Sequence, residues 1–341
     1  MSAEPLRAAI RALASGMSLS ADETAAAFDV VMRGEAKPAQ VAALLMALRV
    51  KGETAEEVTG GARALRSAMV HLPAEDPLAL VDTCGTGGGV LQTFNISTAA
   101  ALLAAGAGVR VAKHGNRSYT TKCGSADVLE ALGVRIEMPV EAMRRTLADA
   151  GIVFMFAPAM HPAMRHVGPV RGDIGVPTIM NILGPLANPA GAGRQVVGVA
   201  EEARLSVLAH ALAALGSVHA LVVHGMPGID EVSPLGITRV LEVRNGTVRE
   251  WTIDPHWYGL QVADAAEIAG ATPEANAEVI LRVLRNEEHG GARAAVLLNA
   301  AAALYVSARA PSYADALRLA GDALEAGAGL AALERLRRGS G

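Results

Sequence analysis

Aromatic residues are scarce in this chain: Phe, Trp and Tyr together make up 3% of its 341 residues. Hydrophobic residues nevertheless reach 51%, so the core must be built from small aliphatic side chains in closely packed helices and strands. This composition favours an α-rich α/β protein, long enough for one large core or for two domains of ordinary size.

Cysteine is scarce as well, with only Cys84 and Cys123. Two cysteines form neither a disulfide framework nor a zinc site, and we expect two reduced thiols in a cytoplasmic protein. No apolar stretch approaches the roughly 20 residues that a membrane-spanning helix needs, and the first residues lack a signal-peptide core. We therefore expect neither export nor membrane insertion.

No excess of positive charge is present either, since the formal net charge is -4. This balance argues against a global attraction for nucleic acid or for an anionic membrane. Any anion must therefore be bound by local basic groups.

Helix-start signals fill the first part of the chain. Ser20 with Glu23 forms a capping-box pattern, Pro38 opens the next apolar stretch, and Thr54 caps a third. We predict a small all-helical domain over residues 1–72, whose amphipathic helices bury their apolar sides against each other or against a partner subunit.

After this domain, short apolar runs alternate with helical patterns. This βαβα order predicts a mostly parallel central sheet in a larger α/β domain, comprising residues 73–164 and 193–341. A proline-rich stretch from His161 to Pro189 interrupts the alternation, and we expect part of residues 165–192 to cross back to the helical domain. The expected strands span residues 78–81, 109–112, 152–156, 195–199 and 220–224.

A glycine-rich loop, Gly85 to Gly89, follows the first expected strand and precedes a helix that begins near Ser97. Glycines let backbone N–H groups approach an anion closely, and the start of a helix adds its dipole. The loop matches neither the dinucleotide fingerprint nor the P-loop. Alone, it is also compatible with an ordinary glycine-rich turn.

The basic segment Lys113-His114-Gly115-Asn116-Arg117 follows another expected strand. It should therefore lie at the same carboxyl edge of the sheet, the usual ligand position in open α/β folds. Lys113 and Arg117 could neutralise a diphosphate, while Asn116 could orient a second substrate. Taken alone, the segment is equally compatible with a solvated basic turn.

Asp230 and Glu231 follow the expected strand 220–224, again at the carboxyl edge. Adjacent carboxylates suit Mg²⁺, which takes few protein carboxylates and bridges to substrate phosphates, although spacing alone favours an acidic surface turn. Arg171 in the crossing segment could pair with a substrate carboxylate or with Asp173. No nucleophile signature appears.

These motifs occur in one order, and through them nearly the whole chain resembles the anthranilate phosphoribosyltransferase family, which has the nucleoside-phosphorylase-like phosphoribosyltransferase fold. The matching segments are 82–88 (DTCGTGG), 94–98 (FNIST), 111–118 (VAKHGNRS), 124–127 (GSAD), 161–164 (HPAM), 181–189 (NILGPLANP) and 228–232 (GIDEV).

The resemblance implies transfer of the phosphoribosyl group of 5-phosphoribosyl 1-diphosphate (PRPP) to the amine of anthranilate in tryptophan biosynthesis, with Mg²⁺ and a homodimer formed through the helical domain. It assigns no acid, base or nucleophile. The residues implied to hold PRPP are Gly85, Gly88, Gly89, Thr93, Asn95, Ile96, Ser97, Thr98, Lys113, His114, Gly115, Asn116, Arg117, Ser118, Tyr119, Thr120, Thr121 and Ser125. Those implied to meet anthranilate are Gly85, Asn116 and Arg171, and those implied to serve magnesium are Ser97, Asp230 and Glu231.

Two positions depart from the family pattern. Gly89 stands where the family usually has Asp, which removes a carboxylate close to the diphosphate and metal, and Pro177 stands where the family often has Arg. Two alternative functions are a nucleoside phosphorylase of the same fold and a catalytically silent relative that binds nucleic acid. The basic segment and the Asp230-Glu231 pair fit PRPP with magnesium better than the first alternative, and the charge balance argues against the second.

Overall fold

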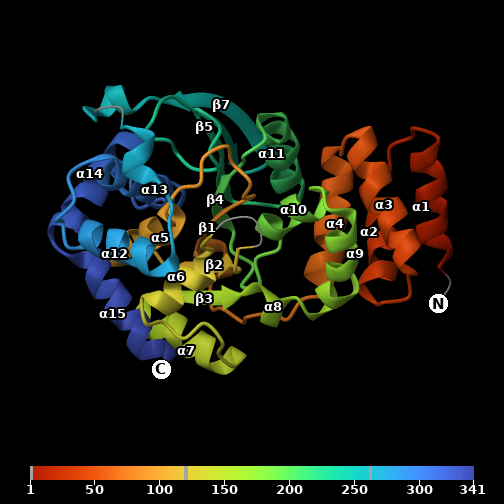
Figure 1. Cartoon of the computed structure of the whole chain (residues 1–341), viewed down its shortest axis with the longest axis horizontal. Helices are drawn as coiled ribbons and strands as arrows, with labels where there is room; N and C mark the ends of the chain where they lie inside the picture. Colours follow the sequence, from red (N-terminus) through yellow and green to blue (C-terminus); the bar gives the residue numbers. More distant parts are fainter. Residues whose placement is uncertain (1–2, 119–121, 261–262) are drawn as a thin grey trace.

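The computed structural model describes residues 3–118, 122–260 and 263–341. A helical bundle at the N-terminus stands beside a larger part built on one sheet, as Figure 1 shows. The bundle helices are α1 (Glu4–Ala14), α2 (Ala21–Met32), α3 (Pro38–Lys51) and α4 (Ala55–Ser67). The predicted fold class, a small helical domain with a larger α/β domain, is confirmed.

Capping boxes fix the starts of α2 and α4, as the sequence predicts. The Ser20 side chain accepts a hydrogen bond from the Glu23 N–H, and the Glu23 carboxylate accepts one from the Ser20 N–H. The fully buried Glu57 caps α4, accepts a hydrogen bond from the Leu19 N–H and pairs with Lys51 Nζ at 2.9 Å. This one carboxylate therefore ties α4 to the residues that flank α2 and end α3.

Among the described residues, seven strands form one sheet in the order β3-β2-β1-β4-β5-β6-β7. The first five in this order are parallel, and β6 and β7 add an antiparallel hairpin at one edge. The strands are β1 (Val81–Gly85), β2 (Val111–Gly115), β3 (Ile152–Phe156), β4 (Arg194–Gly198), β5 (His219–Gly225), β6 (Thr238–Arg244) and β7 (Thr247–Ile253). The sheet is thus mostly parallel, as predicted.

Helices cover both faces of this sheet. In β5, Leu221 and Val223 belong to the core beneath α5, α13, α14 and α15, whereas Ala220 and Val222 belong to the core shared with α11 and the bundle. A smaller core joins α7 to β2 and β3. The remaining helices are α5 (Ile96–Gly106), α6 (Ser125–Ala131), α7 (Val140–Ala150), α8 (Ala157–Met160), α9 (Gly168–Ile174), α10 (Met180–Leu183), α11 (Leu205–Ala214), α12 (Pro273–Leu284), α13 (Gly291–Val306), α14 (Tyr313–Glu325) and α15 (Ala328–Ser340).

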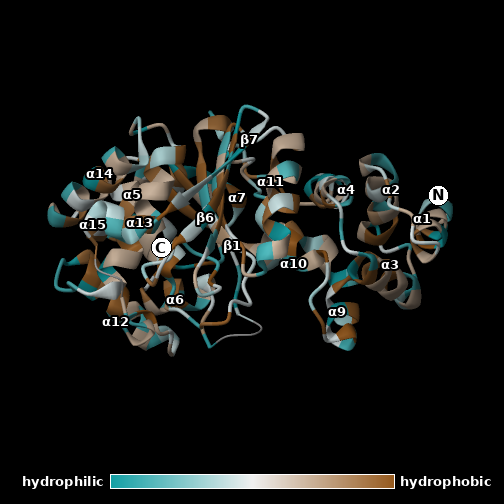
Figure 2. Cartoon of the chain, turned by 90° about the horizontal axis from the view of Figure 1, so that it is seen from above, coloured by the Kyte–Doolittle hydropathy of each residue, from teal (hydrophilic) through white to brown (hydrophobic). Residues whose placement is uncertain are grey.

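The proline-rich segment runs along the junction of the two parts. Helix α9 packs against α3, and α10 packs against α4. Val170 of α9 and Leu183 of α10 lie in the same core as the bundle helices. Figure 2 shows α10 and α11 between the sheet and α4.

Two expected strands begin later than predicted. Residues Pro77–Ala79 form a 3-10 turn capped by Asp76, so the first strand starts at Val81 and not at residue 78. The Val109 N–H donates to Ala104 O at the end of α5, which keeps residue 109 out of the second strand. Within the described part of the chain, every helix is too short or too polar to cross a membrane.

Candidate active site

Three strands end in glycine where the segment carrying Asp230 and Glu231 crosses the carboxyl edge of the sheet. A Cβ on Gly198 would lie 1.7 Å from the Asp230 backbone O, and one on Gly85 would lie 2.3 Å from Asp230 Oδ2. A Cβ on Gly225 would lie 2.5 Å from the Glu231 backbone O. The glycines therefore let this acidic segment settle directly onto the strand ends.

The two carboxylates contact the groups that the sequence singled out. Asp230 Oδ2 accepts a hydrogen bond from the Gly87 N–H at 2.8 Å, and Glu231 Oε1 accepts one from the Ser97 N–H at 3.1 Å. Ser97 lies in the first turn of α5, where backbone N–H groups and the helix dipole favour an anion. The glycine-rich loop, the start of α5 and the acidic pair thus meet at one place.

Lys113 joins the same cluster from β2 and is almost completely buried. Its Nζ donates to Thr83 O and lies 3.2 Å from Ser97 Oγ. Burial lowers the pKa of Lys113, although the nearby Asp82 carboxylate opposes this change. Because its ammonium group is held by these neighbours, Lys113 orders Ser97 in this structure.

The attraction of Lys113 for Glu231 only partly offsets the burial of the acidic pair. Burial raises the pKa of Asp230, and burial together with the Asp230 carboxylate raises the pKa of Glu231 to about 8. No group of three or more His, Cys, Asp or Glu side chains that could hold a metal occurs among the described residues. Two carboxylates beside the Ser97 hydroxyl fit a cation such as Mg²⁺, which completes its shell with water and substrate phosphate oxygens.

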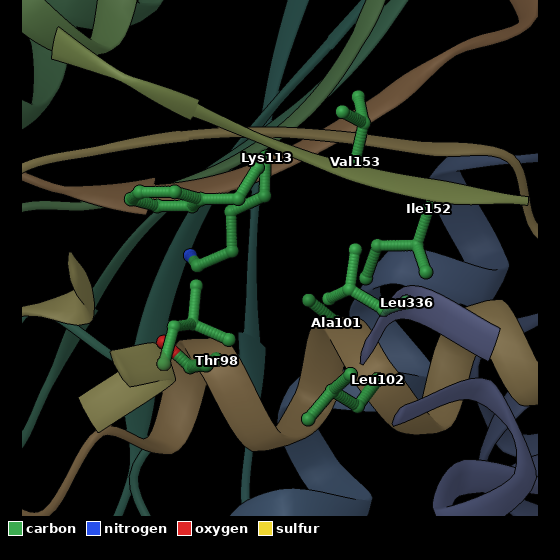
Figure 3. Close-up of a pocket in the computed structure, with 9 residues that line it drawn as sticks. Thr98, Ala101, Leu102, Lys113, Ile152, Val153 and Leu336 are labelled. Carbon is green, nitrogen blue, oxygen red and sulfur yellow. The ribbon is translucent and has the colours of Figure 1, made fainter. Parts of the chain in front are cut away.

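A cavity of about 10 Å³ lies between α5 and β3, lined by Thr98, Lys113 and apolar side chains, as Figure 3 shows. The Thr98 hydroxyl is buried without a hydrogen-bond partner in the structure. The cavity holds about one water at most, far less than the roughly 300 Å³ of a small-molecule site. This cavity is therefore too small for a substrate, whereas the carboxyl edge of the sheet is the usual ligand position in open α/β folds.

Two histidines form a buried pair next to Lys113. His114 Nε2 lies 3.2 Å from His161 Nε2. Burial lowers the pKa of His114 to about 3, with a further contribution from His161, and burial lowers the pKa of His161 to about 4. Both rings are therefore neutral near pH 7, and one ring donates the shared hydrogen bond while the other accepts it.

Asp82 and Asn188 were quoted in the sequence motifs without a role, and the structure gives them one. Asn188 Nδ2 donates to Asp82 Oδ2 and to Ala112 O, each at 2.8 Å, while Asp82 Oδ1 accepts from the His114 N–H. These contacts link β1, β2 and the crossing segment behind Lys113. An Asp and an Asn inside otherwise apolar segments are the sequence signal for such a buried link.

Asn299 is a third residue that the sequence reasoning missed. It lies in the mostly apolar helix α13, where its Oδ1 accepts from the Val232 N–H at 2.9 Å and its Nδ2 donates to Val232 O at 2.8 Å. The paired contacts hold the residue directly after Glu231. A lone amide in a long apolar helix was the available signal.

The glycine-rich loop approaches the segment before the acidic pair. Gly88 is exposed and has a φ of 80°, a conformation that favours glycine. A Cβ on Gly89 would lie 3.0 Å from Gly228 O, and the Val90 N–H donates to that same oxygen at 3.0 Å. An Asp at position 89 would therefore require this contact to open by a few tenths of an ångström.

Thr93, Asn95 and Ile96 lead into α5. Thr93 forms an isolated β-bridge with Ala269, and Asn95 Nδ2 donates to Cys123 O at 3.3 Å. Ile96 is fully buried, so its side chain contributes to the core. Contact between this stretch and a ligand would therefore involve backbone groups and the polar side chains.

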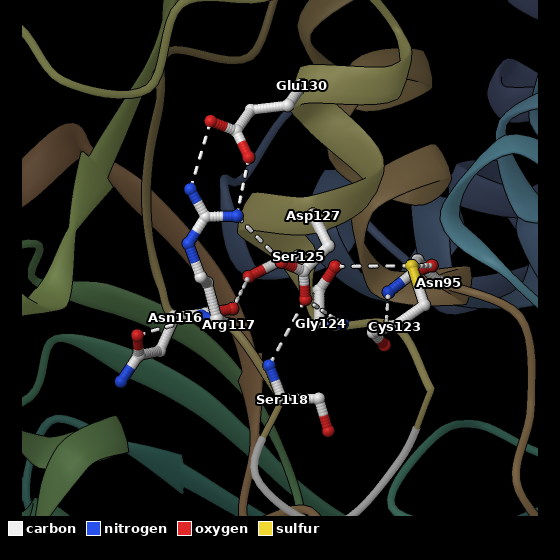
Figure 4. Close-up of polar contacts among 9 residues, drawn as sticks. All are labelled: Asn95, Asn116, Arg117, Ser118, Cys123, Gly124, Ser125, Asp127 and Glu130. Carbon is white, nitrogen blue, oxygen red and sulfur yellow. Dashed lines mark hydrogen bonds and ion pairs between the residues drawn. The ribbon is translucent and has the colours of Figure 1, made fainter.

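The segment that joins β2 to α6 runs from Gly115, the last residue of β2, through Asn116 to Ser125, the first residue of α6. Asn116 Oδ1 accepts from the Arg117 N–H at 2.7 Å, and Ser125 Oγ donates to Asn116 O at 3.3 Å. Figure 4 shows the Arg117 side chain extended towards Glu130 of α6. Ser118 is described, whereas Tyr119, Thr120 and Thr121 lie outside the described residues.

Arg171 belongs to a different part of the molecule. It lies in α9 and is half-buried, and α9 packs against α3 of the bundle. Pro177, the second departure from the family pattern, is exposed in the turn that follows α9. Neither position is on the sheet edge itself.

Comparison with known proteins agrees with this arrangement. The helical bundle domain of a glycosyl transferase family matches residues 7–69, and the a/b domain of that family matches residues 78–330. The anthranilate phosphoribosyltransferase of Rubrobacter xylanophilus is 50% identical over 98% of this chain and 97% of the relative. That of Herpetosiphon aurantiacus is 49% identical over 97% of this chain and 98% of the relative.

Solved structures give the same result. The anthranilate phosphoribosyltransferase of Thermus thermophilus matches with a TM-score of 0.91 at 42% identity, covering 97% of this chain and 98% of that one. The enzyme from Saccharomyces cerevisiae in complex with PRPP and Mg matches with a TM-score of 0.88 at 28% identity, covering 98% and 97%. The chain therefore belongs to the anthranilate phosphoribosyltransferase family.

Proposed function

We propose that this protein transfers the phosphoribosyl group of PRPP to the amine of anthranilate, giving N-(5-phosphoribosyl)anthranilate and diphosphate in tryptophan biosynthesis. The observation that carries the proposal is the meeting of Gly87, Ser97, Asp230 and Glu231 at the sheet edge. The glycine-rich loop beside the start of α5 suits a phosphate, and the carboxylate pair suits a magnesium ion. The yeast relative solved with PRPP and Mg supports the same ligands.

In this reaction the anthranilate nitrogen forms a bond to the ribose anomeric carbon, and the bond from that carbon to the diphosphate oxygen breaks. Negative charge grows on the leaving diphosphate, so the backbone of the glycine-rich loop and the dipole at the start of α5 stabilise it. Bound Mg²⁺, held by Asp230, Glu231 and the Ser97 hydroxyl, would supply further charge neutralisation there. The amine attacks as a neutral group and loses its proton to water afterwards, so no side chain has to act as base.

We assign the binding residues as the resemblance does, within the described part of the chain and apart from the side chain of Arg117. Asn116 and Arg171 would orient anthranilate from the sheet edge and from α9, and Gly85 would be a further contact. Holding the amine in line with the breaking bond lowers the barrier by removing the entropy of encounter. The roles of Tyr119, Thr120 and Thr121 rest on the resemblance alone.

We further infer a helical domain of residues 1–72 joined by part of residues 165–192, and a homodimer formed through that domain. The packing of α9 and α10 on α3 and α4 supports the first inference. Exposure of 81% of Val50 on α3 supports the second. A cytoplasmic location is supported by the scarcity of cysteine, with Cys84 and Cys123 as the only two in the sequence.

The test is a magnesium titration of turnover with PRPP and anthranilate, followed by the loss of anthranilate fluorescence. We expect turnover that rises with Mg²⁺ and vanishes with a chelator. Nucleosides with inorganic phosphate serve as the alternative substrates. Phosphorolysis of a nucleoside without consumption of anthranilate would contradict the proposal.

Variants make the assay specific to the site. Glu231→Gln should raise the Mg²⁺ concentration for half-maximal turnover by tenfold or more, because it removes one charged oxygen ligand. Arg171→Ala should raise the KM for anthranilate by about tenfold and leave that for PRPP unchanged, because a charge-assisted hydrogen bond is lost. Arg165→Ala, an exposed arginine in the same crossing segment, is the matched control.

A further inference from the structure

The two ends of the segment that joins β2 to α6 lie against each other. A Cβ on Gly124 would lie 2.4 Å from the Ser118 N and 2.6 Å from the Asn116 O, so only a glycine leaves room for this approach. The Ala126 N–H donates to the Asn116 O at 3.2 Å. The backbone that leaves β2 and the backbone that enters α6 are therefore in direct contact.

One carboxylate holds these two backbone stretches together. Asp127, in the first turn of α6, accepts hydrogen bonds through Oδ2 from the Gly124 N–H at 2.8 Å and the Ser118 N–H at 3.2 Å. Its Oδ1 accepts from Arg117 Nη1 at 2.8 Å. Figure 4 shows these contacts around the Asp127 side chain. We call Asp127, Arg117, Ser118 and Gly124 the Asp127 clip.

The electrostatics keep this carboxylate ionised. Burial alone would raise the pKa of Asp127, but hydrogen bonds from the Gly124 N–H, from Arg117 and from the Ser118 N–H outweigh burial and lower it. Its side chain is only 19% exposed. The Asp127 carboxylate is thus a charged acceptor that is largely sheltered from water, and hydrogen bonds to such an acceptor are strong.

The Arg117 guanidinium is committed to this arrangement. Beyond Asp127, it pairs through both of its terminal nitrogens with the Glu130 carboxylate, one turn further along α6. Two carboxylates therefore already compensate its single positive charge. A diphosphate would have to displace at least one of them to reach the guanidinium.

We propose that Asp127 is a positioning residue for PRPP, and that the Arg117 guanidinium acts through Asp127 and not as a direct diphosphate ligand. The inference rests on the proposed function, because Asn116, Ser118 and Ser125 of this segment are the groups assigned to the substrates. By fixing Ser118 and Gly124, the clip sets where Asn116 and Ser125 stand on the sheet edge. Loss of the clip leaves the backbone intact but misplaces these groups.

Asp127→Asn tests the proposal with almost no change of shape. An amide presents one acceptor oxygen, so either the two N–H groups or the Arg117 guanidinium would face an NH₂ group. We expect the dissociation constant of PRPP with Mg²⁺, measured by calorimetry without anthranilate, to rise by about tenfold or more, the loss typical of hydrogen bonds to a charged group. Hydrogen exchange of the Ser118 and Gly124 amides should quicken, with little change in Tm.

Glu130→Gln is the matched control, because it weakens only the exposed pair with Arg117 and leaves the Asp127 contacts in place. Its PRPP affinity should stay within about twofold of the wild type, as expected for a surface ion pair. Arg117→Gln should weaken PRPP binding less than Asp127→Asn does. A larger loss for Arg117→Gln would overturn the proposal, because it would mark a direct ligand.

The outcomes also separate this inference from the proposed function. A wild type that binds PRPP but consumes no anthranilate would defeat the proposed function, while the binding constants of the variants would still decide the role of Asp127. Unchanged PRPP affinity in Asp127→Asn, or a general loss of exchange protection across the sheet, would defeat the inference. A wild type that binds no PRPP would defeat both.

Discussion

The buried environment of His114 and His161 determines the protonation state of both imidazoles. Each imidazole is neutral inside the fold because burial disfavours the charged form. In the unfolded chain the same imidazoles take up protons below about pH 6.5. The pair therefore couples the stability of the whole protein to pH.

The sign follows from the lowered pKa values, about 3 for His114 and about 4 for His161. Stability from the pair is complete above the unfolded value and is lost as the pH falls towards the folded values. At pH 5 we expect a loss of about 2 kcal/mol per histidine relative to pH 7. Urea unfolding at both pH values measures this loss.

His161→Gln should reduce the difference in unfolding free energy between pH 7 and pH 5 by about 2 kcal/mol, since one titrating group is removed. His210→Gln, at an exposed position on α11, is the control and should keep the wild-type difference. An equal pH-dependent loss in His161→Gln and in the wild type would contradict the assignment.

At the scale of elements, the glycines that end β1, β4 and β5 leave the space in which the segment carrying Asp230 and Glu231 lies. Gly198→Ala would place a methyl carbon 1.7 Å from Asp230 O if nothing moved, so the acidic segment has to shift. We expect the Mg²⁺ concentration for half-maximal turnover to rise tenfold or more, because about 1 Å of misplacement can cost up to about a hundredfold in rate.

Gly321→Ala in α14 is the control for this variant. No atom lies within 4 Å of a Cβ at position 321, so the substitution should be neutral or slightly stabilising in a helix. Circular dichroism checks that both variants keep their helices. If Gly198→Ala retained the wild-type magnesium titration, the strand-end glycines would not control the position of Asp230.

Local signals explain why some elements could be predicted from the sequence. Ser20 with Glu23 and Thr54 with Glu57 specify helix starts within four residues, and α2 begins where these rules place it. The β6–β7 hairpin is missing from the predictions, although it turns at Asn245-Gly246, both with positive φ. That dipeptide is a hairpin signal which could have revealed it.

The candidate site was predictable as a set of segments but not as a geometry. Order along the chain placed the Lys113 segment and the Asp230-Glu231 pair at the carboxyl edge of strands. The contact of Asp230 with the Gly87 N–H joins residues far apart in sequence, and no local pattern encodes it. The same holds for the Asn299 contacts with Val232, which depend on how α13 packs.

At the scale of the whole molecule, an ion-pair network joins the helical bundle to the α/β part. Arg204, just before α11, lies 3.7 Å from Glu53, which connects α3 to α4, and both side chains are largely buried. Arg204 also binds Glu201, which in turn pairs with the more exposed Arg49 of α3. The proposed acceptor site spans the same two parts, so this network helps to fix the position of one part relative to the other.

Arg204→Leu should lower the free energy of unfolding by about 3 kcal/mol, because it leaves the Glu53 carboxylate buried without its partner. Arg49→Ala removes only an exposed pair and should cost less than about 1 kcal/mol. Urea unfolding of the two variants gives the comparison. Equal losses would show that burial of the Arg204–Glu53 pair contributes nothing beyond a surface contact.

The glycines at the ends of β1, β4 and β5 also have an evolutionary consequence. Every missense change at a glycine adds atoms, so at Gly85, Gly198 and Gly225 each one-step substitution fills the space that the acidic segment occupies. Every substitution at these codons therefore displaces the acidic segment. Lineages that keep Asp230 and Glu231 in place are therefore expected to retain all three glycines together, whereas a lineage that loses one should soon tolerate the loss of the others.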